Sequence, residues 1–255
     1  MYAIELSNLK FMQYVKLNGG LGNQIFQYSF SLFLKKKGHD VKLDKFIFQH
    51  YDLHKISIQN FDLNLEFAQW EEVKKFYLFK SKFFNNKLKI FSNALYIFFI
   101  KIFNINYINA NFLREKKKIQ NDSYFDDYWQ NLKYVEPIKS ILKKKLKISN
   151  PKKKHLKLLK KIKAQKNSVA IHIRVYTSVR NEDKYHGNLE KDYFDKAVKH
   201  IRKKIKKPFF FIFSNKYSEI KKKIDLKKNE FEVVKDFQDF EDLISFSNCK
   251  HQIIS

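Results

Sequence analysis

Short apolar strands alternate with helical patterns from residue 169 onward, and this alternation restricts the fold more than any other feature of the chain. The predicted strands cover residues 169–173, 209–213, 231–234 and 252–254. Residues 194–205, 216–226 and 240–247, which lie between them, have the apolar spacing of helices. Strands that are apolar along their whole length and are separated by helices are typical of a parallel sheet covered on both faces. We therefore expect an α/β fold.

The carboxyl ends of these strands are the expected place for a ligand. In an open parallel sheet, ligands bind just beyond the carboxyl ends of the strands. The residues found there are Arg174, Ser214, Asn215, Lys235, Asp236 and Ser255.

A glycine-rich loop lies between a strand and a helix near the N-terminus. Residues 14–17 form a predicted strand, 23–37 a helix and 41–43 a returning strand. Gly19, Gly20 and Gly22, three of the five glycines of the chain, lie in the loop before the helix. Glycine there lets the backbone approach a ligand at a helix N-terminus. A plain strand-to-helix turn explains the same residues, because the spacing matches neither a dinucleotide-binding loop nor a Walker loop.

The middle of the chain is harder to interpret. Residues 46–131 include aromatic-rich stretches, 76–84 and 96–107, that fit either helix or strand, so we predict only mixed structure. Residues 138–166 are mostly Lys, Leu and Ile, with Leu156, Leu159 and Ile162 on one stripe. This pattern predicts a helix with a solvated basic face.

The chain is strongly basic, and the type of basic residue limits what this implies. Lys and Arg number 52 against 26 Asp and Glu, a formal net charge of +26 that suits nucleic acid, an anionic membrane or a phosphorylated small molecule. The only arginines are Arg114, Arg174, Arg180 and Arg202. A nucleic-acid reader is expected to carry more, because guanidinium fits phosphates and base edges. We expect no nucleic-acid partner and, at most, peripheral contact with an anionic membrane.

Cysteine content and apolar runs bear on compartment and metal binding. Cys249 is the only cysteine, which excludes an internal disulfide and a thiolate zinc site. The N-terminal residues lack a signal-peptide pattern, and no apolar run approaches the roughly 20 residues of a membrane-spanning helix. No pair of acidic residues has a metal-binding spacing. We predict a cytoplasmic protein without a metal.

Several segments together resemble one enzyme family. Residues 18–28, Asn-Gly-Gly-Leu-Gly-Asn-Gln-Ile-Phe-Gln-Tyr, resemble the N-terminal signature of the bacterial α-1,2-fucosyltransferases, glycosyltransferase family 11. Further segments resemble later family motifs, in family order: residues 51–54, 128–130, 172–174, 186–187 with 193–194, 208–214, and 241–243 with 247–251. The resemblance covers essentially the whole chain.

The resemblance implies both a fold and a reaction. The fold is a GT-B-like arrangement of two Rossmann-type halves, residues 1–150 on the acceptor side and residues 151–255 on the donor side. The reaction is an inverting transfer of L-fucose from GDP-fucose to the 2-hydroxyl of a galactose-containing glycan. Its setting is bacterial surface-glycan synthesis, such as that of lipopolysaccharide O-antigen, at the inner face of the membrane. No metal or other cofactor is implied.

The resemblance also implies a set of donor-binding residues: Arg174, His172, Ser214, Asp242, Gly19, Gly20, Gly22 and Asn23. Arg174 can stabilise the negative charge that grows on the departing diphosphate through paired hydrogen bonds. His172 is implied to lie near the donor, although a strand histidine also fits a structural role. The glycine loop is implied to line the cleft between the halves. The catalytic base is unassigned, with Asp52, Asp126 and Asp127 as candidates.

The chain departs from the family pattern at two places. After His172 and Arg174, the family's second arginine, glycine and aspartate are replaced by Val175, Tyr176 and Thr177, for which Arg180 or Asp183 is a candidate substitute. The family also continues past the last strand into a segment rich in Ser, Phe and Trp, so we expect the second half to be truncated at Ser255. Two alternatives therefore stay open: a truncated, inactive member of the family, and a basic protein that binds nucleic acid or a membrane surface.

Overall fold

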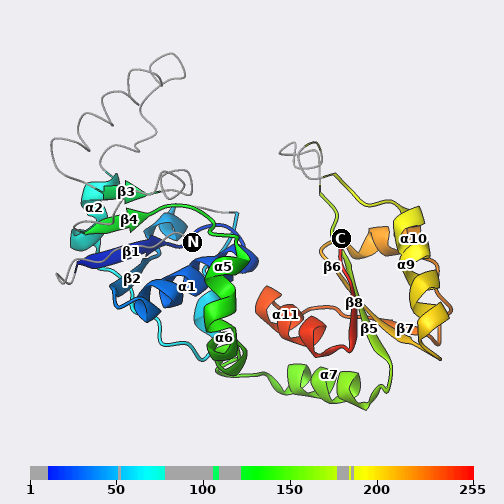
Figure 1. The fold of residues 1–255 in the computed structure, drawn as a ribbon. Helices are drawn as coiled ribbons and strands as arrows, with labels where there is room; N and C mark the ends of the chain where they lie inside the picture. Colours follow the sequence, from blue (N-terminus) through cyan, green and yellow to red (C-terminus); the bar gives the residue numbers. More distant parts are fainter. Residues whose placement is uncertain (1–10, 51–52, 78–105, 109–121, 177–183, 185–186) are drawn as a thin grey trace. The chain divides into compact units, whose positions relative to one another are not determined.

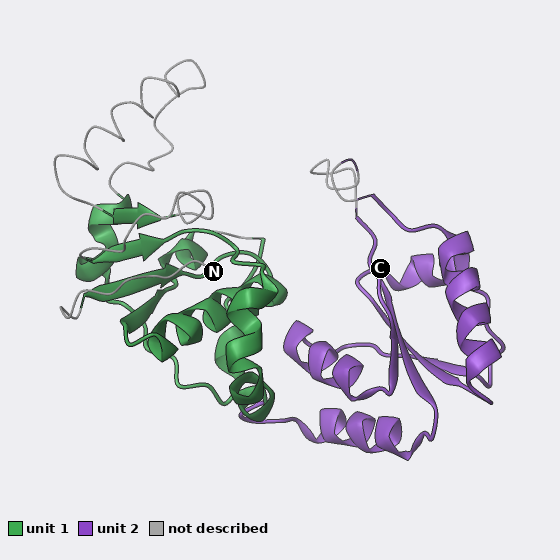
Figure 2. Ribbon diagram, in the orientation of Figure 1, with its two compact units in different colours: residues 1–147 green, residues 148–255 purple. Residues whose placement is uncertain are grey.

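The chain forms two compact units, residues 1–147 and residues 148–255 (Figure 2). The computed structural model describes residues 11–50, 53–77, 106–108, 122–176, 184 and 187–255. Each unit contains a four-stranded sheet, in which all the paired strands are parallel, with helices packed on its faces (Figure 1).

Unit 1 begins with the predicted strand, helix and returning strand. Its elements are β1 (Met12–Lys16), α1 (Leu21–Lys36), β2 (Asp40–Asp44), the 3₁₀ turns η1 (Phe46–Gln49) and η2 (Ile58–Asn60), α2 (Trp70–Tyr77), β3 (Asn106–Ile108), β4 (Ser123–Phe125), α5 (Leu132–Val135), the 3₁₀ turn η4 (Glu136–Ile138) and α6 (Lys139–Lys145). The strand order is β2-β1-β4-β3. Phe30 of α1 packs against Phe125 on one face, with ring centroids 5.2 Å apart. On the other face Phe76 of α2 stacks on Tyr124.

Unit 2 is a sheet covered by helices on both faces. Its elements are α7 (Lys153–Ala164), β5 (Ser168–Ile173), α9 (Lys191–Lys204), β6 (Phe209–Ser214), the 3₁₀ turn η6 (Tyr217–Glu219), α10 (Ile220–Lys223), β7 (Phe231–Val233), α11 (Asp239–Asn248) and β8 (His251–Ile253). Successive residues of a strand point to opposite faces. Ile171 of β5 therefore packs in the cluster with α9 and α10, whereas Ala170 packs in the cluster with α7.

The strand order of unit 2, β7-β6-β5-β8, contains a reversal. The chain proceeds from β5 to β6 to β7 in one direction across the sheet, and β8 then pairs with the other edge of β5. This is the order of strands in one half of a Rossmann fold, where the ligand binds at the carboxyl ends of the two strands that flank the reversal. Those strands are β5 and β8.

The predicted fold class is confirmed: the chain is an α/β protein with two Rossmann-type parallel sheets, as in a GT-B-like enzyme. The predicted long helix over 138–166 is wrong, because Pro151 lies between α6 and α7 and cannot continue a helix. The predicted helix over 216–226 is shorter than expected and consists of η6 and α10. None of the helices in the described ranges has the length and apolar character needed to cross a membrane.

The buried face of α7 also differs from the prediction. Its buried residues are His155, Leu158 and Ile162. Leu156, predicted to be buried, is exposed. The reason is polar: Nε2 of His155 lies 3.1 Å from the backbone oxygen of Glu241 and 3.0 Å from Oγ of Ser245, both on α11. These contacts rotate the helix so that a histidine occupies the interface where the apolar pattern predicts leucine.

Candidate functional site

The glycine loop of unit 1 joins β1 to the start of α1. Gly19 has a φ of +71°, and a Cβ at this position would lie 2.5 Å from Nδ2 of Asn23. The positive φ therefore requires glycine there, and a larger residue would in addition displace the side chain of Asn23. At Gly20 a Cβ would meet only the ring of His54 at ordinary contact distance, and at Gly22 it would meet nothing within 4 Å. The turn itself thus accounts for only one of the three glycines.

Gln24, in the first turn of α1, holds the glycine loop in place through side-chain hydrogen bonds. Its side chain is fully buried and fills all four of its hydrogen-bonding positions. Nε2 donates to the backbone oxygens of Gly19 and Lys55, both at 2.9 Å. Oε1 accepts from the backbone N–H of Ser57 at 2.9 Å and of Ile58 at 3.1 Å. One side chain thereby joins the glycine loop to a segment distant in sequence.

Gln27, one turn later on α1, joins the loop to a third segment. Its Oε1 accepts from the backbone N–H of Asn18 at 3.0 Å, and its Nε2 donates to Asn18 Oδ1 at 3.1 Å. The same Nε2 donates to the backbone oxygen of Asp127 at 3.2 Å. The three segments of this site are therefore held together by two buried glutamines of one helix.

Two rings lie beside the loop. The ring of His54 lies over Gly20, with Cε1 3.6 Å and Nδ1 3.7 Å from the position of a Cβ on that glycine. Cε1 of Tyr128 lies 3.2 Å from the corresponding position on Gly19. An imidazole and a phenol thus border the part of the loop that carries no side chains.

Trp129 explains why its two neighbours are exposed. It has a φ of 54°, which is uncommon for a bulky residue. Its buried indole stacks on Phe30, with ring centroids 4.1 Å apart. The residues on either side, Tyr128 and Gln130, are exposed at the loop, where Gln130 Nε2 donates to Asn23 Oδ1 at 2.7 Å. A strained backbone held by an aromatic stack is typical of functional sites.

The carboxylates considered as bases already have partners. Asp126 forms an ion pair with Lys16 at 3.1 Å, and their side chains are only 10% and 9% exposed. Oδ1 of Asp127 accepts from the backbone N–H of the next residue at 2.7 Å. Asp52 lies outside the described residues. Asp126 thus serves to connect two strands of the sheet, and it is poorly exposed for a reaction.

Arg174 follows β5 at the reversal of unit 2. Its backbone N–H donates to Ser255 Oγ at 2.9 Å, which joins the ends of the β5 and β8 segments. Its guanidinium carbon lies 5.4 Å from the ring centroid of Tyr176. Among the residues that the structure describes, no carboxylate forms an ion pair with this guanidinium. A half-buried cation that no carboxylate neutralises is suited to binding an anion.

Two asparagines hold the backbone beyond Arg174. Asn215 Oδ1 accepts from the N–H of Val175 at 2.8 Å, and its Nδ2 donates to the oxygen of Val175 at 2.9 Å. Asn188 makes the same pair of contacts with Tyr176, at 2.8 and 3.0 Å. Each side-chain amide bonds the backbone N–H and C=O of one residue, as a neighbouring strand would. The segment after Arg174 therefore has its backbone hydrogen bonds without a further strand beside it.

His172 lies on β5 close to the same arginine. Burial, and then the positive charge of Arg174, lower the pKa of His172 below its usual value. Nδ1 lies 3.4 Å from Ser255 Oγ, and the ring meets Phe246 of α11 edge-on at 6.3 Å. A neutral imidazole is therefore favoured here, which adds no second positive charge beside the guanidinium.

Ser214 and Asp242 complete this edge of the sheet. Ser214 ends β6, in register with Ile173, and its Oγ accepts from the N–H of Lys216 at 3.1 Å. Asp242 lies on α11, one turn before Phe246. Burial, and then the charges of two acidic neighbours on α11, raise the pKa of Asp242 to about 7. Its buried Oδ1 has no hydrogen-bond partner among the residues that the structure describes.

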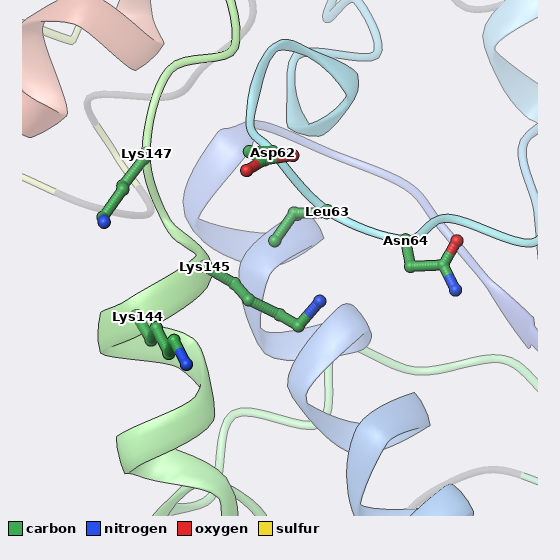
Figure 3. Close-up of a pocket in the computed structure, with 6 residues that line it drawn as sticks. All are labelled: Asp62, Leu63, Asn64, Lys144, Lys145 and Lys147. Atoms are coloured by element: carbon green, nitrogen blue, oxygen red, sulfur yellow. The ribbon is translucent and has the colours of Figure 1, made fainter.

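Unit 1 also has a hollow of ≈ 510 Å³ (Figure 3). It shares no residue with the glycine loop or with the residues around Arg174. Its lining residues are Asp62, Leu63, Asn64, Lys144, Lys145 and Lys147. The side chain of Lys145 extends from α6 toward the facing segment (Figure 3). None of its lining residues is among the predicted site residues. Within the described ranges, no three His, Cys, Asp or Glu side chains lie close enough to hold a metal ion.

The structure divides the eight predicted donor-binding residues between the units. Gly19, Gly20, Gly22 and Asn23 form one group in unit 1, and His172, Arg174, Ser214 and Asp242 lie along the carboxyl edge of the sheet in unit 2. Their roles in binding stay predictions. The substitutes proposed for the altered motif, Arg180 and Asp183, lie outside the described residues, as does Thr177.

Sequence reasoning missed the residues that hold these groups in place. Gln24, Gln27 and Asn188 are the main ones, and none was singled out for its chemistry. A signal for the glutamines exists in the sequence, because both lie on the face of the predicted helix that carries Phe30 and Leu34. A polar side chain on a buried face needs partners, so it indicates a polar network.

A Rossmann-type sheet with an arginine at its reversal, paired with no carboxylate in the described part of the chain, defines an α/β protein of the nucleotide-binding class. Residues 2–255 match the family described as Glycosyl transferase family 11, and the chain belongs to this family. Its members are, in general, fucosyltransferases that use a nucleotide-sugar donor and a glycan acceptor. No curated protein shows significant similarity to the chain. The resemblance to this family is thereby confirmed.

Proposed function

We propose that the chain transfers L-fucose from GDP-fucose to the 2-hydroxyl of a terminal galactoside, with inversion at the anomeric carbon. One observation carries this proposal: in a member of this family, Arg174 lies at the strand reversal of unit 2 and pairs with none of the carboxylates that the structure describes. Under this proposal unit 2 binds the donor and unit 1 binds the acceptor.

Arg174 is proposed to bind the diphosphate of the donor. When the bond to fucose breaks, the electron pair leaves with the diphosphate, and paired N–H···O bonds from a guanidinium stabilise the added charge. Asn188 and Asn215 support this role, because they fix the backbone just beyond the arginine. His172 supports it as well, because its lowered pKa keeps a competing positive charge away.

Asp242 is proposed to contact the guanine base. Its buried Oδ1 has no hydrogen-bond partner in the described ranges, so a ligand that donates N–H groups would satisfy it. Guanine presents such donors on one edge. Ser214 is proposed to lie beside the phosphates, at the end of the strand next to Arg174.

The acceptor is proposed to bind on the glycine loop. The loop offers backbone without side chains at Gly20 and Gly22, the amides of Asn23 and Gln130, and the exposed ring of Tyr128. Pyranose rings have an apolar face and a rim of hydroxyls. An aromatic ring beside hydrogen-bonding amides is suited to both.

The proposed setting is the synthesis of bacterial surface glycans at the inner face of the membrane. Exposed lysines of α7, among them Lys153, Lys157 and Lys160, are suited to contact with anionic lipid. Binding to vesicles of phosphatidylglycerol that weakens steeply with salt would support this part. Equal binding to neutral vesicles would contradict it.

Calorimetry with GDP and variants of Arg174 tests the donor site. Arg174→Ala should weaken binding about 10- to 100-fold, because a charge-assisted pair of hydrogen bonds is lost. Arg174→Lys should restore part of it, since a single ammonium cannot make the paired contact. Arg202→Ala is the matched control, because Arg202 pairs with Glu230 at 2.7 Å on unit 2.

Transfer of labelled fucose to a β-galactoside then tests the reaction. GDP binding that is unchanged in Arg174→Ala would contradict the assignment of this residue. Donor binding without any transfer would instead favour the inactive family member. Salt-sensitive binding of heterogeneous RNA, in the absence of GDP binding, would favour the basic binding protein.

A further inference from the structure

His54 is a titratable ring that lies at the acceptor loop and has no role in the function proposed above. It comes from the segment that Gln24 ties to the loop, through hydrogen bonds to Lys55, Ser57 and Ile58. Its imidazole is half-buried. The ring lies against Gly20 with both nitrogens within 4.0 Å of the Cβ position of that glycine. A Cβ at residue 20 would therefore lie in direct contact with the ring.

The side chains around His54 are suited to holding a sugar hydroxyl close to the imidazole ring. Asn23, in the first turn of α1, and Gln130, from the segment after β4, form a hydrogen-bonded amide pair beside the loop, at 2.7 Å. Tyr128 lies against Gly19, the next residue of the loop. A sugar placed on this surface would have its ring beside an aromatic side chain and its hydroxyls among amides and an imidazole.

The carboxylates near the loop are less suited to taking a proton. Asp126 is paired with Lys16 and almost covered. Asp127 uses Oδ1 to bond the backbone of Tyr128. His54 places an imidazole against Gly20 of the loop, and imidazole is the side chain that changes protonation most readily near neutral pH.

We propose that His54 is the general base that removes the proton from the acceptor hydroxyl. The proposal rests on the proposed function of this chain as a fucosyltransferase. In the step, a ring nitrogen of His54 takes the hydroxyl proton while the acceptor oxygen forms its bond to the anomeric carbon of fucose. The bond from that carbon to the diphosphate oxygen breaks, and its electron pair leaves with GDP. The imidazolium then returns the proton to water.

The test compares fucosyl transfer by His54→Gln and His54→Ala with transfer by the unaltered chain. Loss of a general base should lower kcat about 10²- to 10⁴-fold, while the Kd of GDP, which is bound by the other unit, changes less than about twofold. Added imidazole should restore part of the activity of His54→Ala, because a free base can enter the vacated space. His50→Gln is the matched control, since His50 is an exposed histidine of the same unit and should keep full activity.

The possible outcomes distinguish a failure of the role of His54 from a failure of the proposed fucosyltransferase function. Unaltered kcat in His54→Gln, or a loss in His54→Ala that imidazole does not rescue, overturns the role of His54 and leaves the proposed function intact. If the chain transfers a sugar from another nucleotide donor and still depends on His54, the donor is wrong and the role of His54 stands. If the unaltered chain transfers no sugar, both are overturned. A second substitution, His54→Asn, repeats the comparison if either variant unfolds.

Discussion

At the scale of single residues, unit 2 contains a carboxyl group whose titration is changed by its surroundings. Burial, and then two acidic neighbours, raise the pKa of Asp242 to about 7. The pKa of an aspartate in an unfolded chain is about 4. Between these values the folded chain holds a proton that the unfolded chain has lost. The free energy of unfolding therefore falls as pH rises from about 4 to about 7, and this contribution is constant above that range.

We predict that Asp242→Asn removes this fall. The difference in unfolding free energy between the variant and the unaltered chain should grow as pH rises from about 4 to about 7, with the variant the more stable at pH 8. Urea denaturation at a series of pH values measures it. Asp225→Asn, at an exposed position of the same unit, is the control. A difference that does not change with pH would contradict the raised pKa.

Single residues also show what the sequence could and could not predict about the site. Arg174 and the glycines were found because each lies at the end of a strand or the start of a helix, which local patterns reveal. His54 and Gln130 reach the same loop from segments far along the chain, through contacts made by Gln24 and Asn23. The spacing of residues along the sequence does not show which distant segments come into contact. Both residues lie in segments that resemble family motifs, but only the folded structure shows that they meet at this loop.

At the scale of elements, long periodic segments were predicted and short ones were not. Strands β5 and β6 and helix α9 were predicted because each carries a sustained pattern. Strand β4 has only three residues, too few for a pattern, yet it lies between β1 and β3 in the centre of its sheet. The register of such a strand comes from its partners. Its place in the sheet is a property of tertiary packing.

Helix α1 is the element that positions the glycine loop, and Gln24 makes most of the hydrogen bonds that hold the loop in place. We predict that Gln24→Glu lowers the stability of the chain by about 3 kcal/mol or more, because a carboxylate cannot donate to Gly19 and Lys55 and is buried beside their oxygens. Urea denaturation measures the loss. Gln59→Glu, the same change at an exposed position, should alter stability by less than about 0.5 kcal/mol. Equal effects of the two changes would contradict the structural role of Gln24.

At the scale of the whole molecule, each unit has core clusters of its own. Buried residues around Tyr14 and Phe76 belong to unit 1, and those around Ile171 and Phe211 belong to unit 2. Each cluster contains the apolar faces of a sheet and its helices, the elements that a domain needs to fold around one core. Stability can therefore be changed in one unit through its own core residues.

We predict that matched core substitutions act on different unfolding transitions. Phe30 and Phe210 are 1% and 0% exposed, so Phe30→Ala and Phe210→Ala should each cost about 3–5 kcal/mol, the first in unit 1 and the second in unit 2. GDP at about 100 times its Kd should raise the stability of its own unit by about 2.7 kcal/mol, because it binds only the folded form. Differential scanning calorimetry with and without GDP should therefore show that the nucleotide moves the transition lowered by Phe210→Ala and leaves the one lowered by Phe30→Ala in place. A single transition that both substitutions lower, and that GDP raises in both variants, would mean that the two units unfold together and that GDP stabilises unit 1 as well.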